Sequence, residues 1–548
     1  MTKGNSSADE FCFTRHDEIG AAAAEEDSEF LAACYVDTGD LDVVLASDNP
    51  KRVIVGRTGA GKSALLSHIQ KTEENVIVLS PHSLSLNYIA NNNVIGFFEE
   101  AGVSLSVFYA LLWRHILVVE LLKSKFNITN ENAQKDYTRH IRKILYKKDK
   151  FKEMAVDYLE QWGNKFWLTT EERMHELTKK IESNLAASIK STLPGIDLSA
   201  NGAKNLTEEQ KTQVIHIGKK VVSEIQIREL ENIISVLGED IFADKQQRYY
   251  VIIDGLDEEW VDERIKYSLI KALIDSVRRL KKIPAVKILL AMRKDLLEKV
   301  IHSSKDVGFQ EEKYESLYLR LGWTKENLKD LVDKRIAFLV SRRYTKKPVG
   351  WDDVFPAHVD KEDTIDYLAE RTLYRPRDMI AFMNICLHEA AGDNKITAHT
   401  IKMAEEKYSY DRLYSLATEW QIIFPELHEV AQMFYGMKNY FSVSDVNESW
   451  LEERYLEIFD SISIKNGPLA RMLEGLYGAS ANFSSVRSKL IRELHSVGLF
   501  GVKAGPSSSV NWTHKTGRPI SQGQLKPSSQ IFVHPMFHRA LGIRLAKT

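Results

Sequence analysis

The chain has 548 residues, of which 44% are hydrophobic and 27% are charged, a composition typical of a globular protein with roughly three or four domains. Its formal net charge of −2 argues against electrostatic binding of nucleic acid along the whole chain and leaves only local basic faces for such contacts. The three cysteines share no metal or redox spacing, which gives no disulfide framework and suits a reducing compartment.

Signals for membrane insertion or export are not evident in the sequence. No window approaches the roughly 18 apolar residues without a charge that indicate a membrane span. The N-terminus is polar and lacks the apolar stretch of a secretory signal. We therefore expect a cytoplasmic protein without membrane contacts. Residues 1–50 are expected to form a polar tail followed by one or two helices.

Residues 56–63 match the phosphate-binding pattern G-x-x-x-x-G-K-[ST] in full. Residues 53–55 predict a strand before this loop, and residues 64–69 open a helix after it, whose N-terminus favours anions. Glycines allow the backbone N–H groups to face a phosphate, Lys62 brings charge to the β/γ-phosphates, and the Ser63 hydroxyl can ligate Mg²⁺. The alternative is a glycine-rich turn that binds nothing. The predicted nucleotide-binding residues of this segment are Gly56, Arg57, Thr58, Gly59, Ala60, Gly61, Lys62, Ser63 and Ala64.

A second strand is expected at 76–80, and a long, mainly helical segment follows it. Residues 107–122 are apolar with helical periodicity and contain charges, so they predict a buried helix. Residues 139–152 are dense in Lys and Arg, which is typical of a solvated helix face and otherwise of a surface that recognises nucleic acid or protein. Residues 191–209 carry Gly, Pro, Ser and Asn and predict a flexible connection.

The strand pattern returns at 249–253, a continuous apolar run typical of a strand buried on both faces of a parallel sheet. An amphipathic helix is predicted over about 261–282, and further strands are predicted at 286–292 and 316–319. Strands that alternate with helices predict an α/β fold with right-handed crossovers. We therefore expect a P-loop NTPase parallel sheet with a long helical insertion.

The strand at 249–253 ends in Asp254-Gly255-Leu256-Asp257-Glu258. At the carboxyl edge of such a sheet a carboxylate faces the P-loop and can hold Mg²⁺, so Asp254 is the predicted metal-side residue. A hydrolytic site also needs a group that orients or deprotonates water, and the next acids are Asp257 and Glu258. The alternative is that these acids only cap the following helix, where negative charge is favourable.

This Asp-Gly-x-Asp-Glu ending resembles the signal-transduction ATPases of the STAND class, which include the NACHT proteins. The resemblance implies that Asp257 activates the water and that Glu258 supports it. Many P-loop ATPases carry Glu directly after the strand Asp, whereas this chain has Gly255. Arg293, directly after the predicted strand 286–292, is similar to the nucleotide-state sensor of STAND ATPases. The alternative for Arg293 is a surface arginine at a strand end.

A helix is expected to begin at Arg375-Pro376-Arg377-Asp378. Pro and Asp fit its first turn, whereas the arginines are unfavourable for the helix dipole and indicate an anionic partner. Arg377 resembles the sensor-two arginine of AAA+ and origin-recognition ATPases, which implies a phosphate contact from a helical lid. The alternative is a salt bridge to an acid. This segment is also similar to bacterial stand-alone P-loop ATPases that frequently lie among phage-defence genes.

The C-terminal part is predicted to form a winged-helix domain, in which helices precede a two-stranded wing. Three basic residues would lie on or near the exposed side of the helix that reads DNA in such folds: Arg487, Lys489 and Arg492. The alternative is a domain that only packs against partners. His534 and His538 are four residues apart, but packing and capping are favoured over zinc. The expected elements are helices at 421–436, after Ser444 or Asp445, and from Ser484 or Ser485 to His495, with strands at 441–443, 498–502 and 530–533.

We predict a Mg²⁺-dependent ATPase that acts as a conformational and assembly switch, with ATP and Mg²⁺ as cofactors. No effector enzyme is recognisable in the chain, and the family resemblance implies a homo-oligomeric sensor or regulator in bacterial antiphage defence with a separate effector partner. Two alternatives stay open: an initiator- or loader-like ATPase that binds duplex DNA through its winged helix, and a scaffold that binds nucleotide without hydrolysing it. The predicted catalytic residues are Lys62, Asp257, Glu258 and Arg293. The predicted domains are an N-terminal segment 1–50, an ATPase core 51–95 and 246–322, a helical insertion 96–245, a lid 323–420 and a winged-helix domain 421–548.

Overall fold

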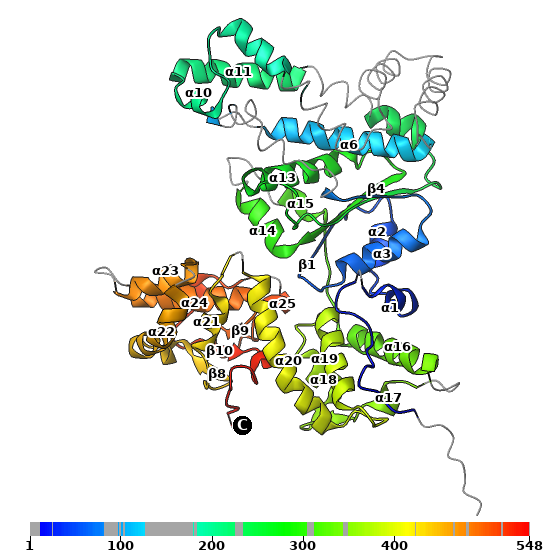
Figure 1. Cartoon of the computed structure of the whole chain (residues 1–548), viewed down its shortest axis with the longest axis vertical. Helices are drawn as coiled ribbons and strands as arrows, with labels where there is room; N and C mark the ends of the chain where they lie inside the picture. Colours follow the sequence, from blue (N-terminus) through cyan, green and yellow to red (C-terminus); the bar gives the residue numbers. More distant parts are fainter. Residues whose placement is uncertain are drawn as a thin grey trace, which may run out of the picture. The chain divides into compact units, whose positions relative to one another are not determined.

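The computed structural model divides the chain into two compact units (Figure 1). The sheet unit comprises residues 37–57 and 62–321, and the helical unit comprises residues 1–36, 58–61 and 322–548. The structure describes residues 11–24, 26–81, 97, 100–101, 105–126, 179, 183–224, 234–303, 312–343, 349–421, 423–463, 466–477, 482–516 and 519–546.

The sheet unit contains a five-stranded sheet in the order β2-β3-β4-β1-β5, and every neighbouring pair is parallel. This confirms the predicted α/β parallel sheet. The last strand begins two residues later than its predicted start. The strands are β1 (Val53–Gly56), β2 (Val76–Leu79), β3 (Tyr249–Ile253), β4 (Val286–Arg293) and β5 (Tyr318–Arg320).

The register of the sheet brings distant segments to one edge. β1 lies between β4 and β5, and Gly56 at the end of β1 is the register partner of Arg293 at the end of β4. β3 pairs with β4, and the acidic run begins directly after it at Asp254. All residues of β1 and β3 are buried, as expected for strands that are covered on both faces.

Helices cover both faces of this sheet (Figure 1). α2 (Asp40–Leu45) and α3 (Lys62–Thr72) lie on one side, and α13 (Glu263–Leu280) and α14 (Lys294–Ser303) lie on the other. α6 (Ser106–Phe126) packs on the outer side of α13, which gives this face a second layer of helix. The central strands β1, β3 and β4 are therefore largely buried, and the carboxyl edge of the sheet is left for the loops.

The helical insertion differs in part from the prediction. The buried helix expected at 107–122 is confirmed as α6, whose Trp113 indole donates to the Leu269 carbonyl at 2.9 Å. The flexible connection expected at 191–209 is wrong, because it contains a short helix, α10 (Ala200–Lys204), and the start of α11 (Glu208–Glu224). The Ser199 side chain accepts from Gly202 N, so a residue taken as loop-forming caps a helix instead. The basic segment 139–152 lies outside the described residues.

In the helical unit, the following helices contribute to one core: α16 (Lys325–Arg343), α18 (Thr364–Ala369), α19 (Pro376–Glu389) and α20 (Ala398–Glu419). The N-terminal segment belongs to the same unit. Phe13 N donates to the Asp393 carbonyl at 2.8 Å, and the Phe13 side chain lies in the core. Phe13 is therefore packed into this unit as part of its core.

The C-terminal part forms a three-stranded antiparallel sheet in the order β8-β10-β9, so the predicted pair of strands around residues 500 and 531 is confirmed. The helix expected at 421–436 is shorter and is broken by turns. Asparagines take the place of the predicted serine or aspartate caps: Asn447 Oδ1 accepts from Trp450 N, and Asn482 Oδ1 accepts from Ser485 N. The elements are α21 (Leu427–Gln432), β8 (Tyr440–Ser442), α22 (Glu448–Ser463), α23 (Pro468–Glu474), α24 (Phe483–Val497), β9 (Phe500–Lys503) and β10 (Gln530–Val533).

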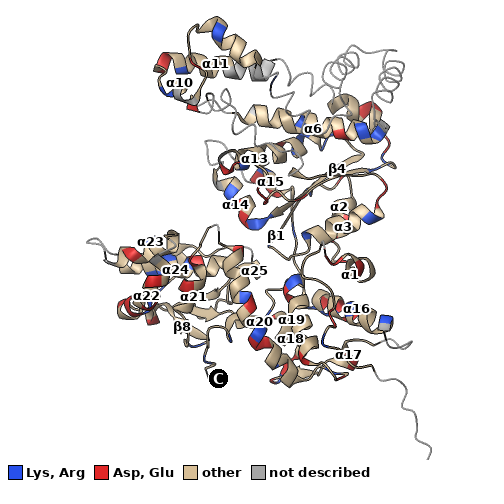
Figure 2. Cartoon of the chain, viewed as in Figure 1, with Lys and Arg blue, Asp and Glu red and all other residues tan. Residues whose placement is uncertain are grey.

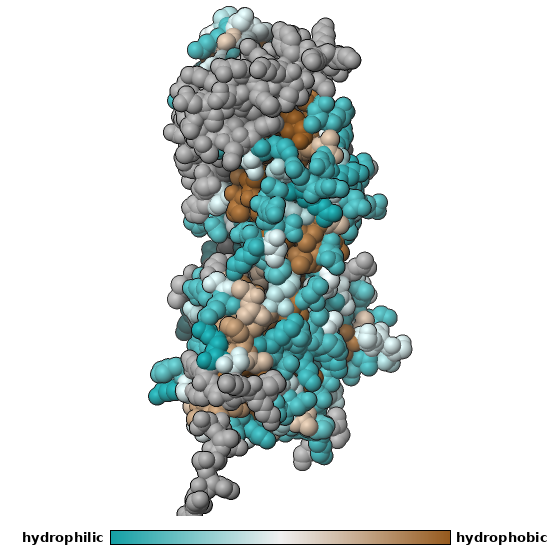
Figure 3. Space-filling model, turned by 90° about the vertical axis from the view of Figure 1, so that its right-hand side faces the viewer, coloured by the Kyte–Doolittle hydropathy of each residue, from teal (hydrophilic) through white to brown (hydrophobic). Residues whose placement is uncertain are grey.

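The surface mixes charges of both signs. Acidic and basic residues occur together on α14, α22 and α24 (Figure 2). On the face shown in Figure 3, hydrophobic residues form small patches among hydrophilic ones. Within the described ranges, no helix has the length and apolar character needed to cross a bilayer.

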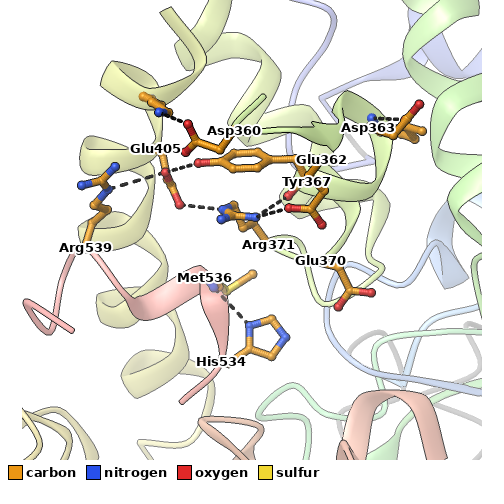
Figure 4. Close-up of polar contacts among 12 residues, drawn as sticks. Asp360, Glu362, Asp363, Tyr367, Glu370, Arg371, Glu405, His534, Met536 and Arg539 are labelled. Carbon is orange, nitrogen blue, oxygen red and sulfur yellow. Dashed lines mark hydrogen bonds and ion pairs between the residues drawn. The ribbon is translucent and has the colours of Figure 1, made fainter. Parts of the chain in front are cut away.

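One buried carboxylate of the helical unit has several polar partners. Glu405 on α20 accepts from the Tyr367 hydroxyl and from Arg371 Nε, both at 2.6 Å, and lies 3.5 Å from Arg539 Nε (Figure 4). The Arg371 guanidinium also lies 3.4 Å from the Tyr367 ring centre, and burial raises the pKa of that phenol above its ordinary value. This network connects α18, α20 and the C-terminal segment through one carboxylate.

A second buried pair connects α16 to the N-terminal segment. Arg335 Nη2 lies 2.5 Å from Asp27 Oδ2, and the two side chains are only 1% and 3% exposed. Arg335 Nη1 also donates to the Ile19 carbonyl at 2.7 Å. Since neither charge reaches water, each depends on the other.

We expect Arg335→Met to lower the free energy of unfolding by about 3–5 kcal/mol, because it leaves the buried Asp27 charge without its partner. The double substitution Arg335→Met with Asp27→Leu removes both charges and should be clearly less damaging than the single one. Chemical unfolding followed by circular dichroism measures both. A single variant as stable as the unaltered protein would contradict this role of the pair.

Candidate nucleotide-binding site

The loop after β1 has the backbone that its sequence predicts. β1 ends at Gly56, and α3 begins at Lys62, so the strand–loop–helix arrangement is confirmed. Gly59 and Gly61 have φ angles of +77° and +96°, which residues with a Cβ rarely adopt. Other residues at these two positions would therefore strain the backbone of the loop.

Lys62 points back over the loop that precedes it. Its Nζ donates to the Gly56 carbonyl at 3.0 Å and to the Arg57 carbonyl at 3.1 Å. Burial lowers the pKa of this ammonium, and the nearby carboxylates of Asp257 and Asp254 act in the opposite direction. The predicted phosphate-binding lysine is thus close to the two carboxylates expected at the sheet edge.

Ser63 and Asp254 come together although 191 positions separate them. The Ser63 hydroxyl donates to Asp254 Oδ2 at 3.1 Å, and Asp254 Oδ1 accepts from Gly255 N at 2.9 Å. The first turn of α3 supplies the hydroxyl, and the residue after β3 supplies the carboxylate. Such a pair of hard oxygens suits Mg²⁺, which is commonly held by one or two protein oxygens together with phosphate and water.

The acidic turn after β3 is held by a lysine that the sequence did not single out. Lys266 Nζ donates to the backbone carbonyls of Asp257 and Glu258, at 3.0 and 2.6 Å. Glu258 N donates to the Gly255 carbonyl at 3.1 Å, which closes the turn. Lys266 is buried on the apolar side of α13. A lysine among the apolar residues of an amphipathic helix needs a polar partner, and this pattern is the feature of the sequence that could have revealed its role.

Arg293 is the last residue of β4, whereas the sequence placed it just after the strand. Its Nε and Nη2 donate to the two carboxylate oxygens of Asp295 at 3.0 and 2.9 Å. Its Nη1 lies 3.6 Å from Asp257 Oδ2. The guanidinium therefore links the end of β4 to the acidic turn, and its principal partner Asp295 was not predicted.

The tip of the loop, residues 58–61, belongs to the helical unit. Pro376 is in the first turn of α19, as predicted, and Arg377 follows it. A Cβ on Gly59 would lie 2.6 Å from the Arg377 Cβ, so the backbone of the loop and this side chain are in direct contact. Arg377 Nε donates to the Ala22 carbonyl at 2.9 Å. The structure thus brings Arg377 to the loop, with its aliphatic part against Gly59.

Arg375 forms the ion pairs that the sequence offered as the alternative. Its Nε lies 2.6 Å from Asp378 Oδ2, and its Nη1 lies 3.0 Å from Glu419 Oε2. Burial alone would lower the pKa of Arg375, but these two carboxylates raise it above its ordinary value. Arg412 Nη1 also lies 3.1 Å from Asp378 Oδ1. The Arg375 guanidinium is therefore held in a network of two arginines and two carboxylates.

The three basic residues of α24 do not share one exposed face. Lys489 is exposed, whereas Arg487 and Arg492 are half-buried, and Arg487 Nη1 donates to the Val446 carbonyl at 3.5 Å. Lys489 and Arg492 are three positions apart and lie on the same side of the helix, whereas Arg487 points in another direction. His534 is buried and caps a short 3₁₀ turn, and the described residues contain no cluster of three His, Cys, Asp or Glu that could hold a metal ion.

Two families of domains match consecutive parts of the chain. Residues 51–320 match the KAP family P-loop domain, and residues 326–417 match the FunZ-associated C-terminal helical domain. With the parallel sheet and the loop described above, the first match gives this region the P-loop NTPase fold.

Individual proteins are similar to the chain over most of its length. The putative transposon gamma-delta 80.3 kDa protein of Escherichia coli (strain K12) is 21% identical over 540 residues, which cover 97% of this chain and 68% of that protein. A Walker-type ATPase of Pyrococcus abyssi has 12% identity and a TM-score of 0.35 and covers 90% of this chain and 95% of its own. Cdc6p from Pyrobaculum aerophilum has 11% identity and a TM-score of 0.29, with 92% and 93% covered.

Proposed function

We propose that the protein is a Mg²⁺-dependent ATPase whose nucleotide cycle switches its conformation and assembly. The observation that carries this proposal is the contact between the Ser63 hydroxyl and the Asp254 carboxylate at 3.1 Å, next to Lys62 in a complete phosphate-binding loop. A hydroxyl and a carboxylate side by side serve the metal, and the lysine beside them serves the phosphates.

Each loop residue then has a definite task. The N–H groups between Gly56 and Ser63 bind the phosphate oxygens, and the Lys62 ammonium exchanges its carbonyl contacts for the β/γ-phosphates. Ser63 and Asp254 would hold Mg²⁺, which neutralises charge on the transferred phosphoryl group when bound.

Asp257 is our candidate for the residue that orients the attacking water. Its carboxylate is 39% exposed, it follows the same strand as Asp254, and Arg293 lies 3.6 Å away. Glu258 lies in the same turn and supports the charge there. Arg293, held by Asp295, is placed to respond when the charge balance around Asp257 changes.

The switch is the part of the proposal that depends on the nucleotide cycle. A nucleotide changes a conformational equilibrium only if it binds the two conformations with different affinity.

We expect Lys62→Ala to abolish ATP binding, because the loop loses its only ammonium for the phosphates. Isothermal titration with MgATP measures this, and Lys71→Ala, an exposed lysine at the end of the same helix, is the matched control. Retained binding in Lys62→Ala would contradict nucleotide binding at this loop.

We expect Asp257→Asn to bind ATP with unchanged affinity and to lower kcat by about 100-fold or more, the usual effect of removing a general base. Release of phosphate under saturating MgATP measures turnover, and Glu259→Gln makes the same change of charge two residues away. Unchanged turnover in Asp257→Asn would remove this residue from the role. An unaltered protein that binds ATP without turnover would favour the scaffold alternative, and turnover stimulated by duplex DNA would favour the loader-like alternative.

We further infer a role in antiphage defence as a sensor or regulator that works with a separate effector. The Asp-Gly-Leu-Asp-Glu run at 254–258 resembles the STAND class, and the Escherichia coli relative is named after a transposon, a mobile element. Cells that carry the gene with its genomic neighbours should give fewer phage plaques than cells with Lys62→Ala. Equal plaque counts over a broad phage panel would argue against this role.

A further inference from the structure

Three consecutive carbonyls of the phosphate-binding loop accept hydrogen bonds from the helical unit. None of the three donors belongs to the phosphate-binding pattern, and two of them are rigid side-chain groups. The bonds run from Arg375 Nη1 to the Thr58 carbonyl (3.1 Å), from Arg377 N to the Gly59 carbonyl (3.4 Å) and from Trp323 Nε1 to the Ala60 carbonyl (3.0 Å).

The geometry of the peptide bond gives these contacts a consequence. The peptide bonds of the loop are trans, so each C=O is antiparallel to the N–H of the next residue. Donors that hold the carbonyls of residues 58, 59 and 60 therefore turn the N–H groups of residues 59, 60 and 61 to the opposite side. Those N–H groups are the ones that a P-loop presents to phosphate.

We propose that Trp323 is a positioning residue for nucleotide binding: its indole N–H holds the Ala60 carbonyl so that the loop presents its N–H groups before the phosphate arrives. This inference rests on the proposed nucleotide-binding function of the loop. A preorganised loop does not have to lose conformational freedom on binding, so it binds more tightly than a loop that must first be ordered.

The surroundings of Trp323 make its position well defined. The residue follows β5, its ring packs against the core of the helical unit, and a Cβ on Gly61 would lie 3.6 Å from the ring. The indole therefore forms a hydrogen bond to Ala60, and its ring lies beside Gly61, where an added Cβ would be in ordinary van der Waals contact with it. A residue with a Cβ at 61 would be strained by the φ of +96° that this position requires.

Trp323 is also the member of the group that can be tested cleanly. Removing Arg375 would take one arginine partner from the buried Asp378 and from Glu419, and the protein would be destabilised for that reason alone. Arg377 reaches the loop through its backbone N–H, which no substitution short of proline removes. Trp323→Phe removes one N–H donor and keeps an aromatic ring.

We expect Trp323→Phe to raise the Kd for MgATP by about five- to tenfold, the loss of roughly one hydrogen bond's contribution. The melting temperature should stay close to that of the unaltered full-length protein, and kcat at saturating MgATP should not change, because the residue acts on the loop and not on the reacting atoms. The apparent KM should rise with the Kd.

The matched control is Trp351→Phe, in the same unit, where the indole stacks on Phe355 with 4.2 Å between ring centres. Its Kd should equal that of the unaltered protein. Tryptophan emission gives a second readout, since a ring against Gly61 should respond when MgATP binds: the signal should persist in Trp351→Phe and disappear in Trp323→Phe.

The outcomes separate the two proposals. If the unaltered protein does not bind MgATP, the proposed function fails and this inference fails with it. If the unaltered protein binds and Trp323→Phe binds equally well, only the positioning role is overturned. Equal loss of affinity in both tryptophan variants would also overturn it, because that result indicates a general effect on packing.

Discussion

The parallel pairing of β3, β4 and β1 is the constraint on which the site depends. Because parallel strands end at the same edge, the loop after β1, the acids after β3 and Arg293 at the end of β4 have to converge there. Ser63 and Asp254 are 191 positions apart and meet through this pairing alone. A register slip of one residue in β4 would separate Arg293 from Gly56 and turn the strand's side chains to the opposite faces.

The backbone N–H groups of the loop after β1 must be oriented before they can bind a phosphate. The N–H groups of a P-loop can face a phosphate only if the carbonyls face away from it, and buried or half-buried carbonyls need donors of their own. Here the helical unit supplies those donors through Trp323 and Arg375. These contacts lie within the helical unit, to which residues 58–61 belong.

Buried ion pairs give the helical unit its rigidity. Asp27, Asp378 and Glu405 each accept from one or more arginines inside the unit, and such pairs are costly to bury unless their geometry is fully satisfied. A guanidinium held between carboxylates cannot turn toward another acceptor without leaving charge behind. This is why Arg375 reaches the loop as a fixed donor to a carbonyl, although its place at a helix start also suits binding of a phosphate.

The sequence alone determined the elements whose physical cause is local. The P-loop follows from two glycines at positions that need positive φ, and the strands follow from apolar runs of β-branched residues, so β1, β3, β4 and the acids beside them were all predictable. The helix at 200–204 was not predicted, because a serine that caps a helix cannot be distinguished in the sequence from a serine in a loop.

Only the tertiary structure decided which side chains act on one another. Lys266, Asp295 and Trp323 belong to no motif, and their roles come from contacts with acids or carbonyls that the fold brings near. Spacing determines the directions in which Arg487 and Arg492 point from α24, but only packing determines that both are half-buried. The type of a residue determines which bonds its side chain can form. Its partner in the folded protein depends on the pairing of strands and the packing of helices that are distant in the sequence, and no local pattern contains this information.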